Sequence, residues 1–107
     1  MNKKYTIVAT FQARSGKEAA LREALVKLLV PTRIEEGCFN YDLHESLEVP
    51  GKFLFYENWS SPATHQKHMD SAHVAQLLER VDELCVNAPE ITFWEELLSV
   101  KTIHEES

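Results

Sequence analysis

The 107-residue chain lacks the residue patterns of a disulfide-rich secreted protein and of a nucleic-acid-binding protein. Its two cysteines, Cys38 and Cys85, lie far apart and form no Cys-x-x-Cys pair, so two reduced thiols are expected. Lys and Arg number 11 against 17 Asp and Glu, which gives a net charge of -6. The basic residues are scattered, and this argues against a nucleic-acid partner because phosphate binding needs clustered cations.

Long apolar runs are also missing, and no leader segment is expected. No apolar stretch approaches the length that a membrane span needs, so no membrane partner is expected. The first residues pass directly into an alternating strand pattern without the features of a secretory or transit peptide, which predicts a cytoplasmic location. The length predicts one domain over residues 1–107, with its core at about 5–100 and a polar tail over 101–107.

Apolar periodicity predicts a strand followed by a helix in the first third of the chain. Alternation over 5–13 indicates the strand. A capping box that begins at Ser15 should start the helix, and the leucines over 21–29 form its apolar stripe. Pro31 should kink or split this helix, and Gly37 should end it.

The rest of the chain predicts a hairpin, two helices and a last strand. Strands over 38–46 and 53–59 are joined by a Pro-Gly turn. A short helix over 62–69 follows, then a second helix, and a long strand over 91–100 closes the pattern. The apolar stripe of the second helix consists of Val74, Leu77, Leu78, Val81, Leu84 and Cys85.

The element order is strand, helix, strand, strand, helix, strand. This order is typical of the ferredoxin-like split β-α-β fold, an α+β fold with a four-stranded antiparallel sheet and its helices on one face. The other face would carry an apolar patch made of Val8, Leu54, Tyr56, Trp94 and Leu98. A monomer would leave this patch in water, so we expect a homodimer that packs sheet to sheet.

The stretch from Glu57 to His73 contains the richest set of groups that can move protons. Imidazole titrates near neutrality, so His68 could take a proton from a phenol or an enediol, or could fix the helix to the sheet. His73, at the start of the next helix, could be a polar group at a pocket mouth or a packing residue. His65 is expected to be exposed, although helical spacing places it on the same side as His68.

Glu57 shares a strand face with aromatic residues. A carboxylate there should have a raised pKa or a charged partner, and it could orient His68, accept a substrate hydroxyl or form a salt bridge. Phe55 and Trp59 could stack on a flat ring or could simply be core. Tyr41 is expected on the same face, where its hydroxyl could donate to a quinol oxygen.

The histidines also raise the question of a metal. His65, His68, His73 and Glu57 offer suitable ligand types, but the His-x-x-His spacing on one short helix is a weak signal and no cysteine joins it. No metal site is therefore predicted.

Three motifs carry a resemblance to a known family. They are Glu35-Glu36-Gly37-Cys38-x-x-Tyr41, Glu57-x-Trp59 and His68-x-x-x-x-His73. With these motifs the chain resembles, over about 5–100, the antibiotic biosynthesis monooxygenase (ABM) superfamily of dimeric α+β-barrel proteins. Its quinol monooxygenase type and its autoinducer-2-processing isomerase type are the most similar.

The resemblance implies a pocket between the sheet and the helices of each subunit. Similar members oxidise electron-rich phenols or quinols with molecular oxygen and use no metal, flavin or haem. Haem-degrading relatives carry an Asn on the first strand, a Trp on the short helix and a His on the next helix. The matching positions here look like Ala9, His68 and Leu78, so haem degradation is not expected.

The resulting hypothesis is a cofactor-independent monooxygenase that oxidises a small electron-rich quinol or polyphenol with molecular oxygen. One alternative is an isomerase of a small enediol or sugar-phosphate signal molecule, although no phosphate-binding motif is visible. Another is a non-catalytic binder of a small aromatic ligand. The expected site consists of His68 and Glu57 as catalytic residues and of Tyr41, Phe55, Trp59 and His73 as substrate-binding residues.

Overall fold

The computed structural model describes residues 4–100, which form four strands and five helices. The strands are β1 (Tyr5–Gln12), β2 (Cys38–Glu45), β3 (Lys52–Trp59) and β4 (Glu90–Trp94). The helices are α1 (Glu18–Val26), α2 (Leu29–Arg33), α3 (Pro62–Met69), α4 (Ala72–Glu79) and α5 (Val81–Leu84). The polar tail predicted over 101–107 lies outside the described residues.

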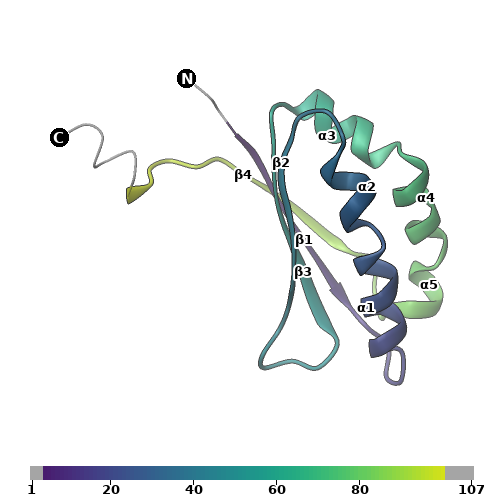
Figure 1. Ribbon diagram of the computed structural model, residues 1–107. Helices are drawn as coiled ribbons and strands as arrows, with labels where there is room; N and C mark the ends of the chain where they lie inside the picture. The colour runs from purple at the N-terminus through teal and green to yellow at the C-terminus, as the bar shows by residue number, and fades with distance from the viewer. Residues whose placement is uncertain (1–3, 101–107) are drawn as a thin grey trace.

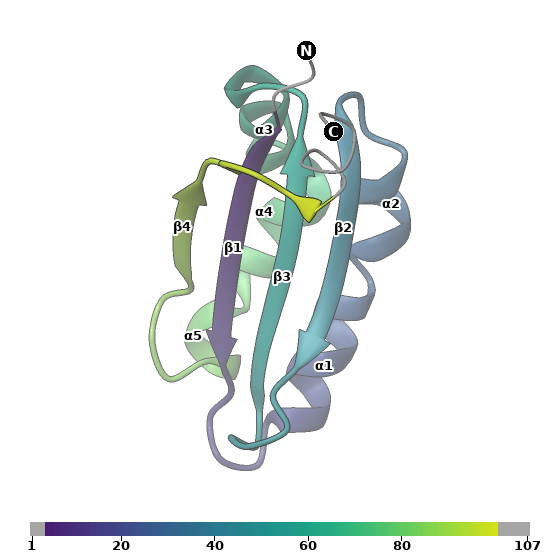
Figure 2. The ribbon, with the colours of Figure 1, turned by 90° about the vertical axis from the view of Figure 1, so that its left-hand side faces the viewer.

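The strands form one antiparallel sheet in the order β2-β3-β1-β4. Figure 1 shows all the helices on one face of this sheet, and Figure 2 looks onto the other face, which carries no helix. In Figure 2, α1 and α2 lie behind the β2 side of the sheet, and α4 and α5 lie behind the β1 and β4 side. The predicted ferredoxin-like α+β fold is therefore confirmed.

Strand parity determines which side chains face the helices. Alternate residues of β1 point into the core, and so do Tyr41 of β2 and Phe55 of β3. Leu21 and Leu25 of α1 and Leu84 of α5 close the core from the helical side. Each such side chain contributes about 1.5–3 kcal/mol of apolar burial, so this core holds the helices on the sheet.

The start of α1 differs from the prediction. The residue before the helix is Lys17, and no side chain caps it. Gly16 has a φ of 86° and turns the chain between Ser15 and the helix. The predicted capping box at Ser15 is therefore wrong, because this turn separates the serine from the free backbone donors.

The predicted split at Pro31 is confirmed, and it falls between α1 and α2 at Lys27 and Leu28. A proline ring clashes with the carbonyl four residues before it, and for Pro31 that carbonyl belongs to Lys27. Pro31 itself lies in the first turn of α2, where its missing N–H costs nothing. The sharp bend that results directs the chain toward the start of β2.

Gly37 links this bend to the start of α3. Its φ is 80°, and a Cβ at this position would lie 2.5 Å from Ser60 Oγ. The Ser60 N–H also donates to the Gly37 carbonyl oxygen over 2.8 Å. Only glycine fits this approach, and as a result the turn that carries Glu35 lies beside α3.

Two later elements are shorter than predicted. The single helix expected up to Cys85 breaks at Arg80, and Leu78 is 45% exposed rather than part of the buried stripe. The last strand ends at Trp94 rather than at residue 100, and its last pair with β1 is Thr6 with Trp94, one residue short of the start of β1. Figures 1 and 2 show the following segment leaving the sheet and crossing in front of β1 and β3.

The uncovered sheet face carries most of the predicted apolar patch. Tyr56 and Trp94 are exposed there, and Val8 and Leu54 are half-buried, whereas Leu98 lies in the segment after β4. The sheet-to-sheet homodimer remains the expectation for this face. Across residues 4–100, none of the helices is long and apolar enough to cross a bilayer.

Candidate functional site

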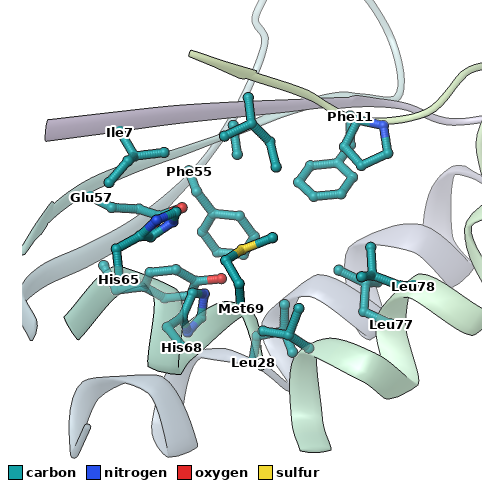
Figure 3. Close-up of a pocket in the computed structure, with 15 residues that line it drawn as sticks. Ile7, Phe11, Leu28, Phe55, Glu57, His65, His68, Met69, Leu77 and Leu78 are labelled. Atoms are coloured by element: carbon teal, nitrogen blue, oxygen red, sulfur yellow. The ribbon is translucent and has the colours of Figure 1, made fainter. Parts of the chain in front are cut away.

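A mostly apolar pocket lies between the sheet and the helices. Its cavity volume is about 40 Å³. In Figure 3, Glu57, His65 and His68 gather at one end, and Phe11, Leu77 and Leu78 lie at the opposite end. The lining residues are Ile7, Ala9, Phe11, Leu28, Tyr41, Phe55, Glu57, His65, His68, Met69, Val74, Leu77, Leu78, Pro89 and Ile91.

His68 is positioned by the short helix α3. The Ser61 hydroxyl accepts a hydrogen bond from the Thr64 N–H over 3.2 Å, and this cap fixes the start of the helix. His68 is only 3% exposed, and its ring lies 5.2 Å from the Tyr41 ring and 4.9 Å from the Trp59 ring. Burial lowers the pKa of His68, and a hydrogen bond to a carboxylate partly offsets this.

That carboxylate belongs to Glu35, in the turn between α2 and β2. Glu35 Oε2 lies 3.0 Å from His68 Nδ1 and 2.6 Å from His73 Nε2. An ionised carboxylate only accepts hydrogen bonds, so both ring nitrogens donate to it. A neutral His68 then carries its proton on Nδ1, which leaves Nε2 as the nitrogen that can accept another proton.

Glu35 was missed as a site residue by sequence reasoning. It lies 33 and 38 positions before its two histidine partners, so no local spacing connects them. The available signal was its place in the Glu35-Glu36-Gly37 motif. Gly37 indicates that the chain passes close to another segment there, because a side chain at this position would clash. This motif was used only for the family resemblance.

Glu57 is buried on β3 and faces the pocket. Burial raises its pKa to about 7, although the Trp59 Nε1–H donates to Glu57 Oε1 over 2.9 Å and favours the ionised form. Within residues 4–100, no ion pair involves Glu57. The raised-pKa expectation for this carboxylate is therefore met, and a salt bridge to a partner subunit stays an untested alternative.

Tyr41 and Phe55 form one wall of the pocket. Their rings stack with centroids 4.3 Å apart and planes 22° from parallel. Burial and the Glu57 charge raise the pKa of Tyr41, so its hydroxyl stays protonated and can act as a donor. Both residues lie where the strand pattern predicted.

Trp59 and His73 lie next to the pocket rather than in its wall. The fully buried Trp59 packs behind His65 and His68. His73 is 23% exposed and lies beyond Glu35, where it borders a separate groove between α1 and α4. The structure thus brings Tyr41, Phe55, Glu57 and His68 together around one space, with Trp59 and His73 as neighbours.

His65 is buried, so its predicted exposure is wrong. Helical spacing places it on the same side of α3 as His68, and that side packs on the sheet. Its ring contacts Tyr5, Trp59 and Phe93. Burial lowers the pKa of His65 to about 4, so this imidazole is neutral at physiological pH.

One cluster has the donor set of a metal site. Atoms of Glu35, His68 and His73 lie within 4.8 Å of one another, whereas Glu57 and His65 belong to no such group in the described part of the chain. Two ligands of a tetrahedral zinc lie about 3.3 Å apart, given bonds of about 2.0 Å. The 2.6 Å between Glu35 and His73 is shorter, and is a hydrogen-bond length.

The sequence motifs, the fold and the pocket between the sheet and the helices agree with one family. Residues 4–80 match the family described as antibiotic biosynthesis monooxygenase (ABM). The chain belongs to this family. The predicted resemblance is thereby confirmed, and membership supports a monooxygenase-like function.

Relatives of known structure share this ABM fold. The chain is 32% identical over 92 residues to a Mycobacterium tuberculosis protein named "Putative monooxygenase Rv0793", covering 86% of this chain and 90% of that one. The structure of Rv0793 superposes with a TM-score of 0.84 at 30% identity, covering 91% and 98% of the two chains. PA3566 from Pseudomonas aeruginosa gives a TM-score of 0.86 at 30% identity, covering 92% and 98%.

Proposed function

We propose that this ABM protein is a cofactor-independent monooxygenase that oxidises a small electron-rich quinol or polyphenol with molecular oxygen. The observation that carries the proposal is the state of His68. Its ring is buried at the wall of a largely apolar pocket, and Glu35 holds the proton on Nδ1. Nε2 can then accept a proton from a bound phenol.

The proton transfer makes the substrate easier to oxidise. A phenolate gives up an electron more readily than a phenol, so the anion can transfer one electron to oxygen and form a substrate radical and superoxide. Their recombination forms a C–O bond. Loss of water then leaves one oxygen atom on the ring, so the balance is RH2 + O2 → RO + H2O.

The neighbouring residues suit this chemistry. The Tyr41 hydroxyl can donate to a ring oxygen, and Phe55 offers a flat apolar surface for an aromatic ring. Glu57, with a pKa of about 7, can exchange a second proton near neutral pH. The apolar lining keeps water away from the reactive anion.

The isomerase alternative has less support from the pocket. A sugar phosphate needs a cationic or backbone N–H site for its phosphate group. No Lys or Arg is among the described residues that line the pocket. We therefore favour the uncharged aromatic substrate.

The proposal is tested by oxygen uptake with a panel of reduced naphthoquinols and polyphenols, corrected for autoxidation with heat-denatured protein. His68→Gln should lower the enzymatic rate by about 100-fold or more, because general base catalysis typically contributes that much. His44→Gln, a change at an exposed histidine of β2, is the matched control and should not alter the rate. Ligand binding without oxygen consumption in the wild type would instead identify a non-catalytic binder.

A further inference from the structure

The Glu35–His68–His73 cluster separates two different spaces. His68 lines the pocket between the sheet and the helices, whereas His73 lines the α1–α4 groove, which is formed by Ala24, Lys27, Leu28, His73, Gln76, Leu77 and Arg80. Glu35 lies between the two imidazoles and binds both through the same oxygen. The cluster therefore runs from the pocket to the surface of the helix layer.

The charges of the three groups depend on one another. One ionised carboxylate balances one imidazolium, so a proton on one histidine makes a proton on the other less favourable. Glu35 Oε2 lies closer to His73 Nε2, at 2.6 Å, than to His68 Nδ1, at 3.0 Å. Burial lowers the pKa of His68, which favours a neutral imidazole that can accept a proton.

We propose that Glu35 couples the two histidines, so that a proton taken up by His68 in the pocket is balanced by a proton that His73 releases into the α1–α4 groove. The inference rests on the proposed function for its catalytic role. His68 Nε2 gains the proton of the substrate hydroxyl, and His73 Nδ1 loses one to groove water. The cluster keeps a total charge of zero in this step. The overall reaction releases no proton, so the step that forms water takes the proton back from His68 Nε2 while His73 regains one from groove water.

Most of the ionisable groups around the cluster do not take part in this proton exchange. The pocket and groove groups around it are Cys38, Tyr41, Glu57, His65, Lys27 and Arg80. Burial raises the pKa of the Cys38 thiol to about 11 and that of the Tyr41 hydroxyl further, and it lowers the pKa of His65 to about 4, so all three stay neutral. On the exposed side, four ion pairs hold the nearby charges: Lys27–Glu23, Arg80–Glu83, Lys67–Glu36 and Arg33–Asp42.

Glu57 also lines the pocket, and its pKa of about 7 means that it titrates near neutral pH. Glu57→Gln therefore serves as the background in which the coupling is measured without this carboxylate. The amide keeps an oxygen that can accept from Trp59 Nε1.

The test follows the ring nitrogens of ¹⁵N-labelled protein by NMR as the pH is changed. We expect His68 to be the Nδ1–H tautomer at neutral pH. His73→Gln, which removes the competing cation but keeps a side-chain donor, should move the His68 midpoint upward by roughly 0.5–1 pH unit. His44→Gln should leave it in place. An unchanged His68 midpoint in His73→Gln would overturn the coupling.

Glu35→Gln gives a second, independent outcome. Loss of the carboxylate should lower the midpoints of His68 and His73 together, and a shift of only one of them would contradict the shared role of Glu35. Zn²⁺ is added to the wild type as a further arm. Stoichiometric binding that moves both ring resonances and is lost in Glu35→Gln would show a metal site instead, which also overturns the proposal.

Measurements of the oxidation rate distinguish proton release through His73 from a purely structural role of this residue. His73→Gln should lower the maximal rate of quinol oxidation, and added imidazole buffer should restore it in proportion to its concentration, whereas wild-type turnover should not respond to the buffer. A slowed variant that imidazole fails to rescue would contradict proton release through His73. If the wild type consumes no oxygen, the proposed function fails, while the NMR coupling still decides whether the cluster exchanges protons.

Discussion

The two faces of the sheet are built from the same strands but are completed in different ways. On β3, Phe55 and Glu57 face the helices and are buried, whereas Tyr56 between them faces the open side and is 42% exposed. Trp94 of β4 is 58% exposed. The chain's own helices pack on the covered face and bury its ionisable groups. The open face exposes apolar side chains that another surface could cover.

The two faces of the sheet therefore differ in the ionisable groups that they can hold. The covered face can hold neutral histidines and a carboxylate of raised pKa because helices exclude water from it. The open face has its polar groups bonded to one another instead. There Thr6 donates to Asn58 Oδ1 over 2.5 Å, and the Asn58 amide donates to Asn40 Oδ1 over 2.9 Å.

Substitutions at two adjacent residues of β3 give the strongest test of the difference between the two faces. Phe55→Ala should lower the free energy of unfolding by about 3–5 kcal/mol, because it leaves a cavity in the covered core. Tyr56→Ala should cost less than about 1 kcal/mol at low protein concentration, since that side chain faces water. Urea unfolding followed by circular dichroism measures both, and equal losses would show that the faces do not differ.

Glu57 tests whether the covered face truly excludes water. Its pKa is about 7 in the folded protein and about 4.5 when unfolded, so between these values the folded state binds more protons and stability falls as pH rises. Glu57→Gln removes this penalty. The variant should gain on the wild type between pH 4.5 and pH 7, reaching an advantage of about 3 kcal/mol above pH 7.

Unfolding midpoints measured across this pH range check the prediction for Glu57. A constant difference between the two proteins would mean that the carboxylate is hydrated. His65→Gln is a useful counterpart. The pKa of His65 is about 4 in the folded protein and about 6.5 when unfolded, so the wild type loses stability as pH falls from 6.5 toward 4. The variant lacks this loss. The two variants should therefore differ from the wild type with opposite pH slopes.

The open face is tested by charge. Trp94→Glu should weaken the expected homodimer by at least about 10-fold in Kd, which corresponds to about 1.4 kcal/mol. Val30→Glu, a change at an exposed apolar residue of α2 on the helical side, is the control. Sedimentation over a range of concentrations measures both, and a wild type that stays monomeric would leave the apolar patch to a different partner.

Much of this comparison could be read from the sequence. Alternation assigned Ile7, Phe55 and Glu57 to the covered face because each strand has a period of two. The length of β4 could not be predicted in this way, since the apolar pattern continues past Trp94 while the pairing with β1 does not. Pairing is a property of two strands, and a single-strand pattern does not show where it stops.

The site was predicted in its parts but not in its connections. His68 was singled out because the resemblance favoured it, yet its bond partner Glu35 comes from a distant turn. The burial of His65 was missed because polarity alone suggested a solvated side chain, whereas its ring packs on Trp59. Helical spacing had placed His65 on the side of His68, and this signal should have been given more weight. The Glu35 contact is long-range, and local spacing contains no information about it.

The smallest predicted effect separates a true helix cap from an apparent one. Ser61→Ala should destabilise the protein by about 1 kcal/mol, because the Ser61 hydroxyl accepts from the Thr64 N–H at the start of α3. Ser15→Ala should change stability by less than about 0.3 kcal/mol, since α1 begins at Glu18 without a side-chain cap. Parallel thermal unfolding of the two variants makes the measurement. Similar losses would mean that Ser15 caps α1 after all, whereas the expected difference would show that a serine fixes the start of α3 and none fixes the start of α1.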